Sequence, residues 1–539
     1  MKIGLTSRFL GPALLIGLSS MAGAQAFHVQ CPTSTSLHPA PGTGSPTGQG
    51  APYNGPTTIS DTGTGGTGLT YMSNGGLIRC QQVSGGDGYA TMADGTQMYL
   101  FAFGPLSGLA DIANGLPGTE TPDVFNTVAM DSLGPGAPGL PPASGTWPTK
   151  YNGAVGLAPD LDAGGVIDGH VDPRPIMDVG VMNGNEPAPL MAIDEDDEFF
   201  LTLTNVGMIM RPDLFEQHTI HFHGYPNASS HYDGVPDASV AVNIGGSMTY
   251  YYLAPDAGTY FWHCHITPPE HLQMGMVGQL YVRPRQNRVP VGGDLYASLV
   301  KQQADPRIAS ACTSDILCST PLPPAPTGKI HGYNKSGAPT LYAYNDGDGS
   351  TAYDVEYPLQ IHGFDPNFHF VGMTFNPEGF ADMKDKYFLL NGRSYPDTVQ
   401  PGTMQTASSD GTPHDSQPLP SIINIPVGGK ALLRISDLDV SEFQTLASLG
   451  IPMKVIALNA RLLRDEAGNN MYYTTNSVTL GGGESLDVIL DATGFTAPQK
   501  FFLYTPNLDH LSNDAENFGG LMTEVNVCNA VDPSTKKCS

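Results

Sequence analysis

The chain has 539 residues, 40% of them hydrophobic, so it is long enough for several domains with sizeable cores. Its formal net charge of −27 disfavours nucleic acid and anionic lipid surfaces as partners. The 65 glycines and 47 prolines separate many short runs of valine, tyrosine and threonine, a pattern typical of strands joined by turns. The composition therefore predicts a soluble all-β protein that binds neither nucleic acid nor membrane.

The first 26 residues have the features of a secretory signal. Lys2 and Arg8 give a positive start, residues 9–18 are apolar, and Ala24-Gln25-Ala26 is a small-residue cleavage site. The apolar run is too short to span a bilayer comfortably. We therefore expect an exported protein, periplasmic or extracellular.

The seven cysteines divide into three pairs and one remaining thiol. Exported proteins normally oxidise cysteines in pairs. Close spacing favours Cys312 with Cys318 and Cys528 with Cys538, which leaves Cys31 to join Cys80. The seventh, Cys264, lies between two histidines, and a free thiol in an oxidising compartment points to metal ligation.

Strand patterning is concentrated in two blocks of the chain, separated by irregular sequence. After the signal, we expect a Gly/Ser/Thr/Pro-rich segment at 27–85, a β-domain at 86–285 with an insertion at about 105–185, an irregular linker at 286–385, a second β-domain at 386–528 and a tail at 529–539. The charged run Asp194–Glu198 is most simply a solvated turn before a strand.

The two patterned blocks look like copies of one unit. Five positions of the first block correspond to five of the second at a constant offset of 232: Ile193, Phe199, Leu201, Leu203 and Asn205 with Ile425, Ala431, Leu433, Ile435 and Asp437. The closing strands at 275–282 and 519–527 also match in character. This repeat predicts two similar all-β units in tandem.

Seven of the chain's 15 histidines fall between His218 and His271. Side chains alternate faces along a strand, so His221 and His223 share one face and His218 points to the other. By the same rule, His263 and His265 share a face opposite Cys264. Adjacent strands would therefore form two sites back to back, one with His218 and Cys264 and one with four imidazoles.

His271, Met274 and Met276 add candidates to the thiol-bearing face. A thiolate, two imidazoles and a weak thioether form the ligand set of a blue-copper site. We assign Cys264, His218 and His271 as strong ligands and Met276 as the axial ligand, with Met274 as the fallback. Zinc also accepts Cys/His sets, and lone histidines are often only solvated, but ligand softness and spacing favour copper.

These segments resemble the motifs of the multicopper oxidases. His218-Thr-Ile-His221-Phe-His223-Gly224 is similar to their H-P-x-H-L-H-G motif. The run from His263-Cys-His-Ile266 to Met276 is similar to their H-C-H-I motif in its ascorbate-oxidase version, and Asp233-Gly-Val-Pro236 to their D-G-V-P stretch. The resemblance covers 190–285 closely and 386–527 loosely.

The resemblance implies tandem cupredoxin-like Greek-key β-sandwiches and a copper oxidase. His218, Cys264, His271 and Met276 would bind type 1 copper, His221 the type 2 copper, and His223, His263 and His265 the type 3 pair. The family takes one electron at a time from donors such as phenols or metal ions and reduces dioxygen to water. Asp233 and Glu270 are the candidate proton donors.

Three departures from the family pattern qualify this prediction. Thr267-Pro-Pro-Glu270 lengthens the loop before His271 by about two residues. A complete trinuclear centre uses four H-x-H motifs, and this chain has two. The second unit has Phe502-Leu-Tyr-Thr-Pro506 in place of the cysteine motif, and Met453-Lys-Val455 roughly where an H-x-H pair is expected.

The missing motifs leave room for a homo-oligomer that completes the cluster. His362 and His369, in the expected linker, could complete such a site at a subunit interface, and His331, His414 and His510 are similarly isolated. For all five, the simpler interpretation is a solvated or structural side chain. Two alternative functions stay open: a non-catalytic blue-copper electron carrier and a copper nitrite reductase. The second family has an aspartate where His221 stands and no histidine after the cysteine, which argues against it.

Overall fold

In the computed structural model, the described residues are 29–35, 77–125, 158–161, 167–172, 182–208, 210–225, 229–254, 256–288, 341–373, 379–407, 413–532 and 535–539. The predicted signal, His331 and the Cys312/Cys318 pair lie outside them. The predicted disulfides Cys31–Cys80 and Cys528–Cys538 are confirmed, and Cys264 is a free, buried thiol. No helix of the described part is long and apolar enough to cross a bilayer.

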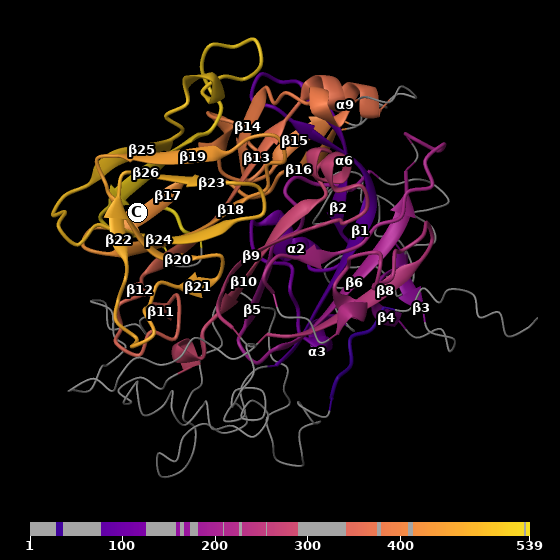
Figure 1. Cartoon of the computed structure of the whole chain (residues 1–539), viewed down its shortest axis with the longest axis horizontal. Coiled ribbons are helices and arrows are strands. Elements are labelled where there is room, and N and C mark those ends of the chain that lie inside the picture. The colour runs from indigo at the N-terminus through magenta and orange to yellow at the C-terminus, as the bar shows by residue number, and fades with distance from the viewer. Residues whose placement is uncertain are drawn as a thin grey trace, which may run out of the picture.

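The amino-terminal unit is a sandwich of two four-stranded sheets (Figure 1). The first sheet has the order β2 (Gln97–Pro105), β1 (Ile78–Thr91), β6 (Glu198–Gly207) and β8 (Ser247–Leu253). The second has the order β5 (Met191–Asp194), β10 (Val277–Arg283), β9 (Gly258–His263) and β7 (His221–Phe222). From β5 to β9, each strand lies in the other sheet from the strand before it. Strands that follow one another in the sequence therefore face each other across the sandwich.

The core of this unit follows from side-chain alternation. Phe199, Leu201 and Leu203 of β6 point inward at every second position and are fully buried. Tyr250 and Tyr252 of β8 do the same, and the rings of β9 meet them from the other sheet. The alternation that is visible in the sequence therefore sets which face of each strand forms the core.

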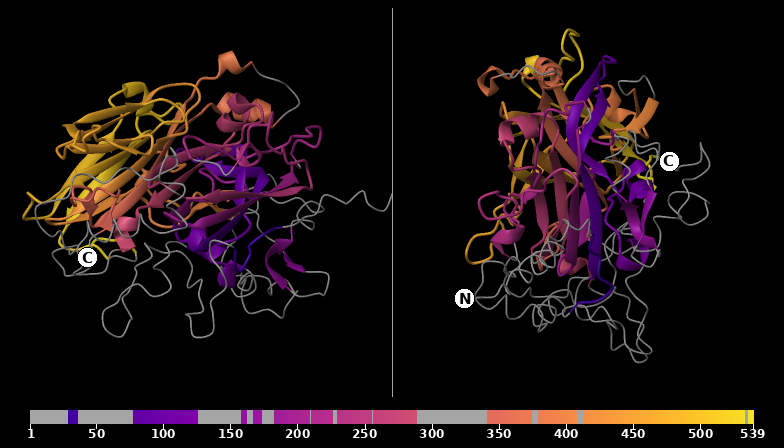
Figure 2. Two further views of the ribbon diagram at one scale, coloured as in Figure 1. Left: turned by 60° about the horizontal axis from the view of Figure 1, so that its bottom comes forward. Right: turned by 90° about the vertical axis from the view of Figure 1, so that its right-hand side faces the viewer.

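The carboxy-terminal unit repeats this arrangement with a larger first sheet. Figure 2 shows this unit, in orange and yellow, beside the indigo and magenta amino-terminal unit. That sheet has the order β14 (Tyr387–Leu390), β13 (Val355–Phe364), β18 (Lys430–Asp437), β24 (Ser485–Asp491), β20 (Met453–Leu458) and β21 (Arg461–Leu462), with β22 (Tyr473–Thr475) also paired to β20. The other has β17 (Ile423–Pro426), β26 (Met522–Cys528), β25 (Gln499–Tyr504), β19 (Gln444–Leu449) and β23 (Ser477–Leu480).

The internal repeat extends to strand pairing. Strands β5 and β6 begin at Met191 and Glu198, and β17 and β18 begin 232 residues later at Ile423 and Lys430. The parallel pair β1–β6 matches β13–β18, and the antiparallel pair β9–β10 matches β25–β26. Two tandem β-sandwiches, as predicted, are confirmed.

Buried polar contacts join the two units along β9 and β10. Thr259 Oγ1 donates to Asp487 at 2.6 Å, and the amide of Gln279 donates to Ser436 at 2.8 Å. The guanidinium of Arg434 lies 4.8 Å from the ring centroid of Tyr281. Strand β9, which leads to Cys264, is therefore held by both units.

Three expectations for the irregular regions are corrected. The segment 27–85 already contains the start of β1, and the segment 286–385 contains β13, the central partner of β18, with β11 (Leu341–Tyr342), β12 (Ala352–Tyr353) and α9 (Pro366–Gly372). The insertion at about 105–185 holds α2 (Leu109–Ala113), α3 (Pro122–Phe125), β3 (Ala158–Leu161) and β4 (Ile167–Asp172). The glycines of β1 and the proline within β13, Pro358, concealed these strands in the sequence. The short pair β15 (Met404–Ala407) and β16 (Pro413–Ser416) lies in the second unit.

The acidic run Asp194–Glu198 is also not the solvated turn we expected. All five side chains are buried. Asp196 forms an ion pair with Arg285 at 2.8 Å, and Asp197 one with Arg79 at 3.3 Å. These partners lie far along the chain, so tertiary contacts, not local sequence, make burial of the charges tolerable.

Candidate metal centres

The pairing of β7 with β9 places the histidines. His221 lies directly opposite His263, and Phe222 opposite Trp262. Residues directly opposite each other in a pair point to the same face, so both histidines leave the sheet on one side. The rings of Phe222 and Trp262 enter the core on the other side, with centroids 5.9 Å apart.

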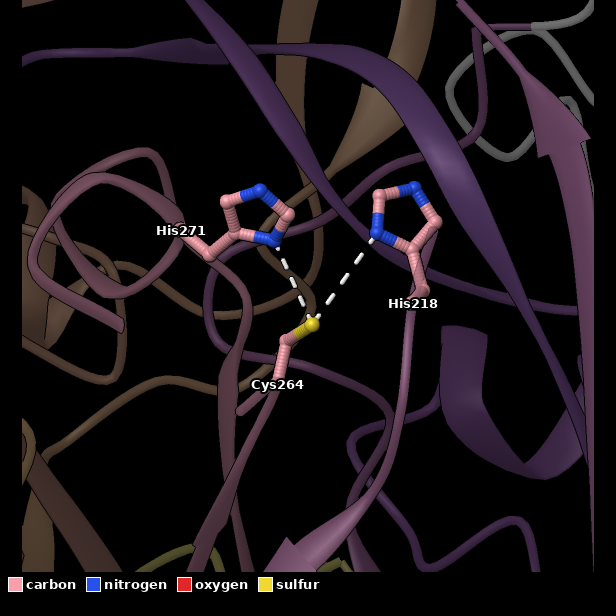
Figure 3. Close-up of side chains that lie close together, drawn as sticks. All are labelled: His218, Cys264 and His271. Atoms are coloured by element: carbon pink, nitrogen blue, oxygen red, sulfur yellow. Dashed lines mark hydrogen bonds between the residues drawn. The ribbon is translucent and has the colours of Figure 1, made fainter. Parts of the chain in front are cut away.

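The residue that follows β9, Cys264, points into the core toward His218 and His271 (Figure 3). Its sulfur lies 3.2 Å from Nδ1 of His271 and 4.0 Å from Nδ1 of His218. All three side chains are buried, and their ligand atoms lie within 4.8 Å of one another. This is the set of strong ligands expected for the thiol-bearing site.

The lengthened loop before His271 is accommodated by a short helix, α6 (Pro268–Gln273). Thr267, with a φ of 36°, turns the chain, and two prolines begin the helix. His271 lies in the last turn of α6. The backbone then ties the loop together: Met276 N donates to the carbonyl of His271 at 2.8 Å, and Cys264 N donates to that of Met276 at 3.1 Å.

The two methionines face different neighbours. A methyl group added at Gly85 of β1 would lie 2.6 Å from the ring of His218 and 3.3 Å from the terminal carbon of Met276. A methyl group added at Gly372 of α9 would lie 3.2 Å from the sulfur of Met274. Met276 therefore shares its surroundings with His218, which favours it over Met274 as the thioether of this site.

The electrostatics of the buried thiol match a metal ligand. Burial raises the pKa of Cys264, but the neighbouring His271 and His218 outweigh it and hold that pKa well below its usual value. Burial lowers the pKa of His271, but Cys264 and Glu216 more than compensate and raise it to about 9. A thiolate beside imidazoles is the donor chemistry that selects a soft redox metal.

The opposite face of β7 and β9 holds His221, His223 and His263, whose ligand atoms also lie within 4.8 Å of one another. Each ring directs Nδ1 at a backbone carbonyl: His221 at Asp233 (2.7 Å), His263 at Cys264 (2.6 Å) and His223 at Gly483 (3.2 Å). The Nε2 atoms then converge, and those of His223 and His263 are 3.0 Å apart.

This imidazole set fits a metal ion. Burial, followed by the charge of His221, lowers the pKa of His223 to about 4, and burial holds that of His263 well below its usual value. With the Nδ1 protons donated to carbonyls, two Nε2 lone pairs face each other, an arrangement that a bound cation relieves. His265 is close by, its ring centroid 5.0 Å from that of His221.

The two carboxylates predicted as proton donors occupy different sites. Asp233 lies beside the imidazole set, its Oδ1 3.6 Å from Nδ1 of His221. Glu270 lies on α6, next to His271 in sequence. A third carboxylate, Glu216, was missed: its Oε2 lies 3.5 Å from Nε2 of His271. Its position two residues before His218 was the only sequence signal for it.

The ring of His271 offers no exposed edge on which an electron donor could dock. The side chain of His271 is 0% exposed, and its Nε2 lies 3.5 Å from the carboxylate of Glu216, whose side chain is 25% exposed. The helical turn that replaces a simple loop buries the ring. Glu216 is therefore a partly exposed polar group in direct contact with a proposed ligand of the thiolate site.

The remaining histidines do not join either set within the described residues. His362 lies in β13 and pairs with the buried Glu186 at 2.9 Å, and His369 in α9 is also buried. Both side chains are therefore enclosed within the chain, which agrees with a structural role and not with a ligand site at a subunit interface. His510 is buried between Gln444 and Glu442, and no side-chain position is described for His414.

The second unit also lacks ligands where the fold repeats the site. Ala447 of β19 is opposite Tyr504 of β25, just as His221 is opposite His263. The position equivalent to His223 is then Leu449, and Thr505 follows β25 where Cys264 follows β9. The expected location at Met453-Lys-Val455 was wrong, because those residues form β20 in the other sheet.

A cavity of about 380 Å³ adjoins the imidazole set and lies between the two units. His223 and Phe261 line it from the first unit, and Asp439, Glu442 and the glycines 481–483 from the second. Among the described residues, no lysine or arginine lines it. The cavity gives a small neutral molecule a path to His223 and disfavours an anion.

Comparison with known proteins agrees with this site. Residues 168–287 match the family model described as multicopper oxidase. The chain is 34% identical over 109 residues to laccase abr2 of Aspergillus fumigatus; the matched region covers 20% of this chain and 17% of that protein. It is 36% identical over 109 residues to the copper-containing nitrite reductase of Rhizobium meliloti; the matched region covers 19% of this chain and 26% of that protein.

The chain thus spans 17% and 26% of the length of these two curated relatives. Among solved structures, the blue copper oxidase from Nitrosomonas europaea aligns over 83% of this chain and 85% of its own, with a TM-score of 0.45 and 18% identity. The sequence matches involve only about a fifth of this chain, and the family model covers the segment that contains both ligand sets.

Proposed function

Because residues 168–287 match the family model of the multicopper oxidases, we propose that this protein couples one-electron oxidation of a small phenolic or metal-ion donor to the reduction of dioxygen. Copper bound at the two sets would accept single electrons and pass them to the oxidant. His218, Cys264, His271 and Met276 would hold the type 1 ion. His221 would serve the type 2 ion, and His223, His263 and His265 the type 3 pair.

One residue that belongs to both sites carries this proposal. Cys264 presents its sulfur to His218 and His271, while its carbonyl oxygen accepts a hydrogen bond from Nδ1 of His263 at 2.6 Å. The peptide bonds on either side of Cys264 lead to His263 and His265. A short covalent route therefore joins the thiolate to the imidazole set, as an electron path between two redox sites requires.

The flanking residues have roles that follow from their positions. Glu216 lies at the solvent side of His271 and would receive the donor through a hydrogen bond or its negative charge. Asp233, 3.6 Å from His221, would supply protons at the imidazole set. Glu270, next to His271 in α6, would supply protons where the electron donor binds. The two H-x-H motifs leave the imidazole set half complete relative to the family, and a second subunit would complete it.

A copper nitrite reductase is the second candidate, supported by the similarity to the protein from Rhizobium meliloti. Two observations favour the oxidase over it. His221 and His265 are both present, and the cavity beside His223 carries Asp439 and Glu442, which disfavour entry of an anion such as nitrite. An electron carrier would bind copper at the thiolate site alone.

Copper quantification with visible spectroscopy tests the proposal. We expect more than one copper per chain, an intense blue thiolate band, and oxygen consumption when a phenol is supplied. Cys264→Ser should abolish the blue band and oxygen consumption. The control His231→Gln, at an exposed histidine outside both sets, should change neither. A blue protein with one copper and no oxygen consumption would instead be a carrier, and nitrite consumption a reductase.

A further inference from the structure

The turn between β23 and β24 of the second unit contacts the imidazole set. Gly483 has a φ of +90°, and its carbonyl accepts a hydrogen bond from Nδ1 of His223 at 3.2 Å. A methyl group added at Gly483 would lie 2.6 Å from Nδ1 and Cε1 of that ring. The close approach of the carbonyl to the imidazole therefore requires glycine in both conformation and size.

His223 differs from the other two imidazoles of the set in the origin of its carbonyl partner. The partners of His221 and His263 are Asp233 and Cys264, both in the amino-terminal unit. The partner of His223 comes from the second unit, whose described residues form no ligand set. Such outer hydrogen bonds fix the tautomer and ring orientation of metal-binding histidines.

The glycine turn is held firmly relative to the site. Gly483 N donates to the carbonyl of Asp437 at 2.9 Å, and Glu484 accepts from Gly481 N at 2.7 Å. Two residues beyond the turn, Ser485 Oγ donates to the carbonyl of Thr259 at 2.6 Å. Thr259 lies on β9, the strand that ends at His263, so the turn and the imidazole set share one support.

We infer that Gly483 is a positioning residue of the imidazole site, through which the second unit orients His223 so that its Nε2 faces the metal. This inference rests on the proposed function and assigns the ligand-free unit a part in assembling that site. Removal of the contact should weaken copper binding at the imidazoles and leave the thiolate site, on the other face of the strands, unchanged.

The test compares Gly483→Ala with Gly95→Ala. Gly95 has a φ of +88°, nearly the same as Gly483, but a methyl group added there meets no atom within 4 Å. The control therefore carries the same backbone strain without the contact. Each protein is titrated with copper; the blue band reports the thiolate site, and paramagnetic resonance with total copper reports the imidazole site.

We expect Gly483→Ala to lose at least about tenfold in copper affinity at the imidazole site, with the blue band and circular dichroism of the wild type. Gly95→Ala should keep both sites. Wild-type affinity at the imidazole site in Gly483→Ala would overturn the inference, as would an equal loss in Gly95→Ala.

A second measurement uses the metal-free wild type and so does not depend on the folding of a variant. Imidazole ¹⁵N spectra should show His223 with its proton on Nδ1; a proton on Nε2 overturns the inference. If the wild type binds no copper at the imidazoles, the proposed function fails, and this tautomer measurement still decides whether Gly483 orients the ring.

Discussion

Gly85 shows how closely the backbone of β1 packs against the thiolate site. Its Cα faces the ring of His218 and the terminal carbon of Met276, both fully buried. Because β6 and β2 hold β1 on both sides, the strand has little freedom to withdraw. A side chain at this position must therefore displace a proposed ligand.

We predict that Gly85→Ala shifts or weakens the blue band and lowers the free energy of unfolding by about 1–3 kcal/mol, the usual effect of overpacking. Visible absorption and urea unfolding would measure these. Gly86→Ala is the matched control, because its methyl group would meet Val206 and the carbonyl of Gly207 instead. Equal spectral changes in the two variants would mean that the thiolate site does not depend on Gly85.

The short segment around Glu120 pairs with β1 through its backbone and carries a buried carboxyl group. Its backbone exchanges two hydrogen bonds with Cys80 of β1, at 2.8 and 2.9 Å. Burial, followed by the charge of Asp111, raises the pKa of Glu120 to about 8 from the ordinary 4.5. The folded protein therefore keeps this proton over a pH range in which the unfolded chain releases it.

Unfolding then releases a proton between about pH 4.5 and pH 8, so this group's contribution to stability is complete below pH 4.5 and is lost as the pH rises through 8. In the wild type, this group should make the free energy of unfolding fall by up to about 1.4 kcal/mol per pH unit over that range. We predict that this fall is absent in Glu120→Gln. Urea unfolding at pH 5 and pH 8 would measure it. Glu516→Gln, at an exposed position, should keep the wild-type dependence.

At the scale of the whole molecule, Arg434 connects the units through a buried charge network. The guanidinium is fully buried, donates to Glu356 at 3.1 Å and lies 3.8 Å from Asp487. It also faces Tyr281 of the first unit. Removing one member of a buried network leaves uncompensated charges in a medium of low dielectric constant.

We predict that Arg434→Met lowers the free energy of unfolding by about 3–5 kcal/mol. Lys500→Met, which breaks the exposed ion pair with Glu524, should change it by about 1 kcal/mol or less. Denaturant midpoints, followed by tryptophan fluorescence, would measure both. A small effect at Arg434 would show that the units do not depend on this network.

Local sequence by itself determined the inward faces of the recognised strands and the residues of the two candidate ligand sets. Alternation with period two fixed the inward faces of β6 and β18, and the spacing of His218, His221 and Cys264 fixed which ligand points to which face. The constant offset of 232 determined the repeat. These are short-range properties, since the backbone sets side-chain direction within a few residues.

Contacts across hundreds of residues decided the rest. The burial of Asp194–Glu198, the role of β13 as a central strand and the position of His362 each depend on a partner distant in the chain. The carbonyl that Gly483 offers to His223 comes from 260 residues away. No local pattern encodes such neighbours, because packing of two folded units creates them, and it is this packing that determines how the imidazole set is surrounded.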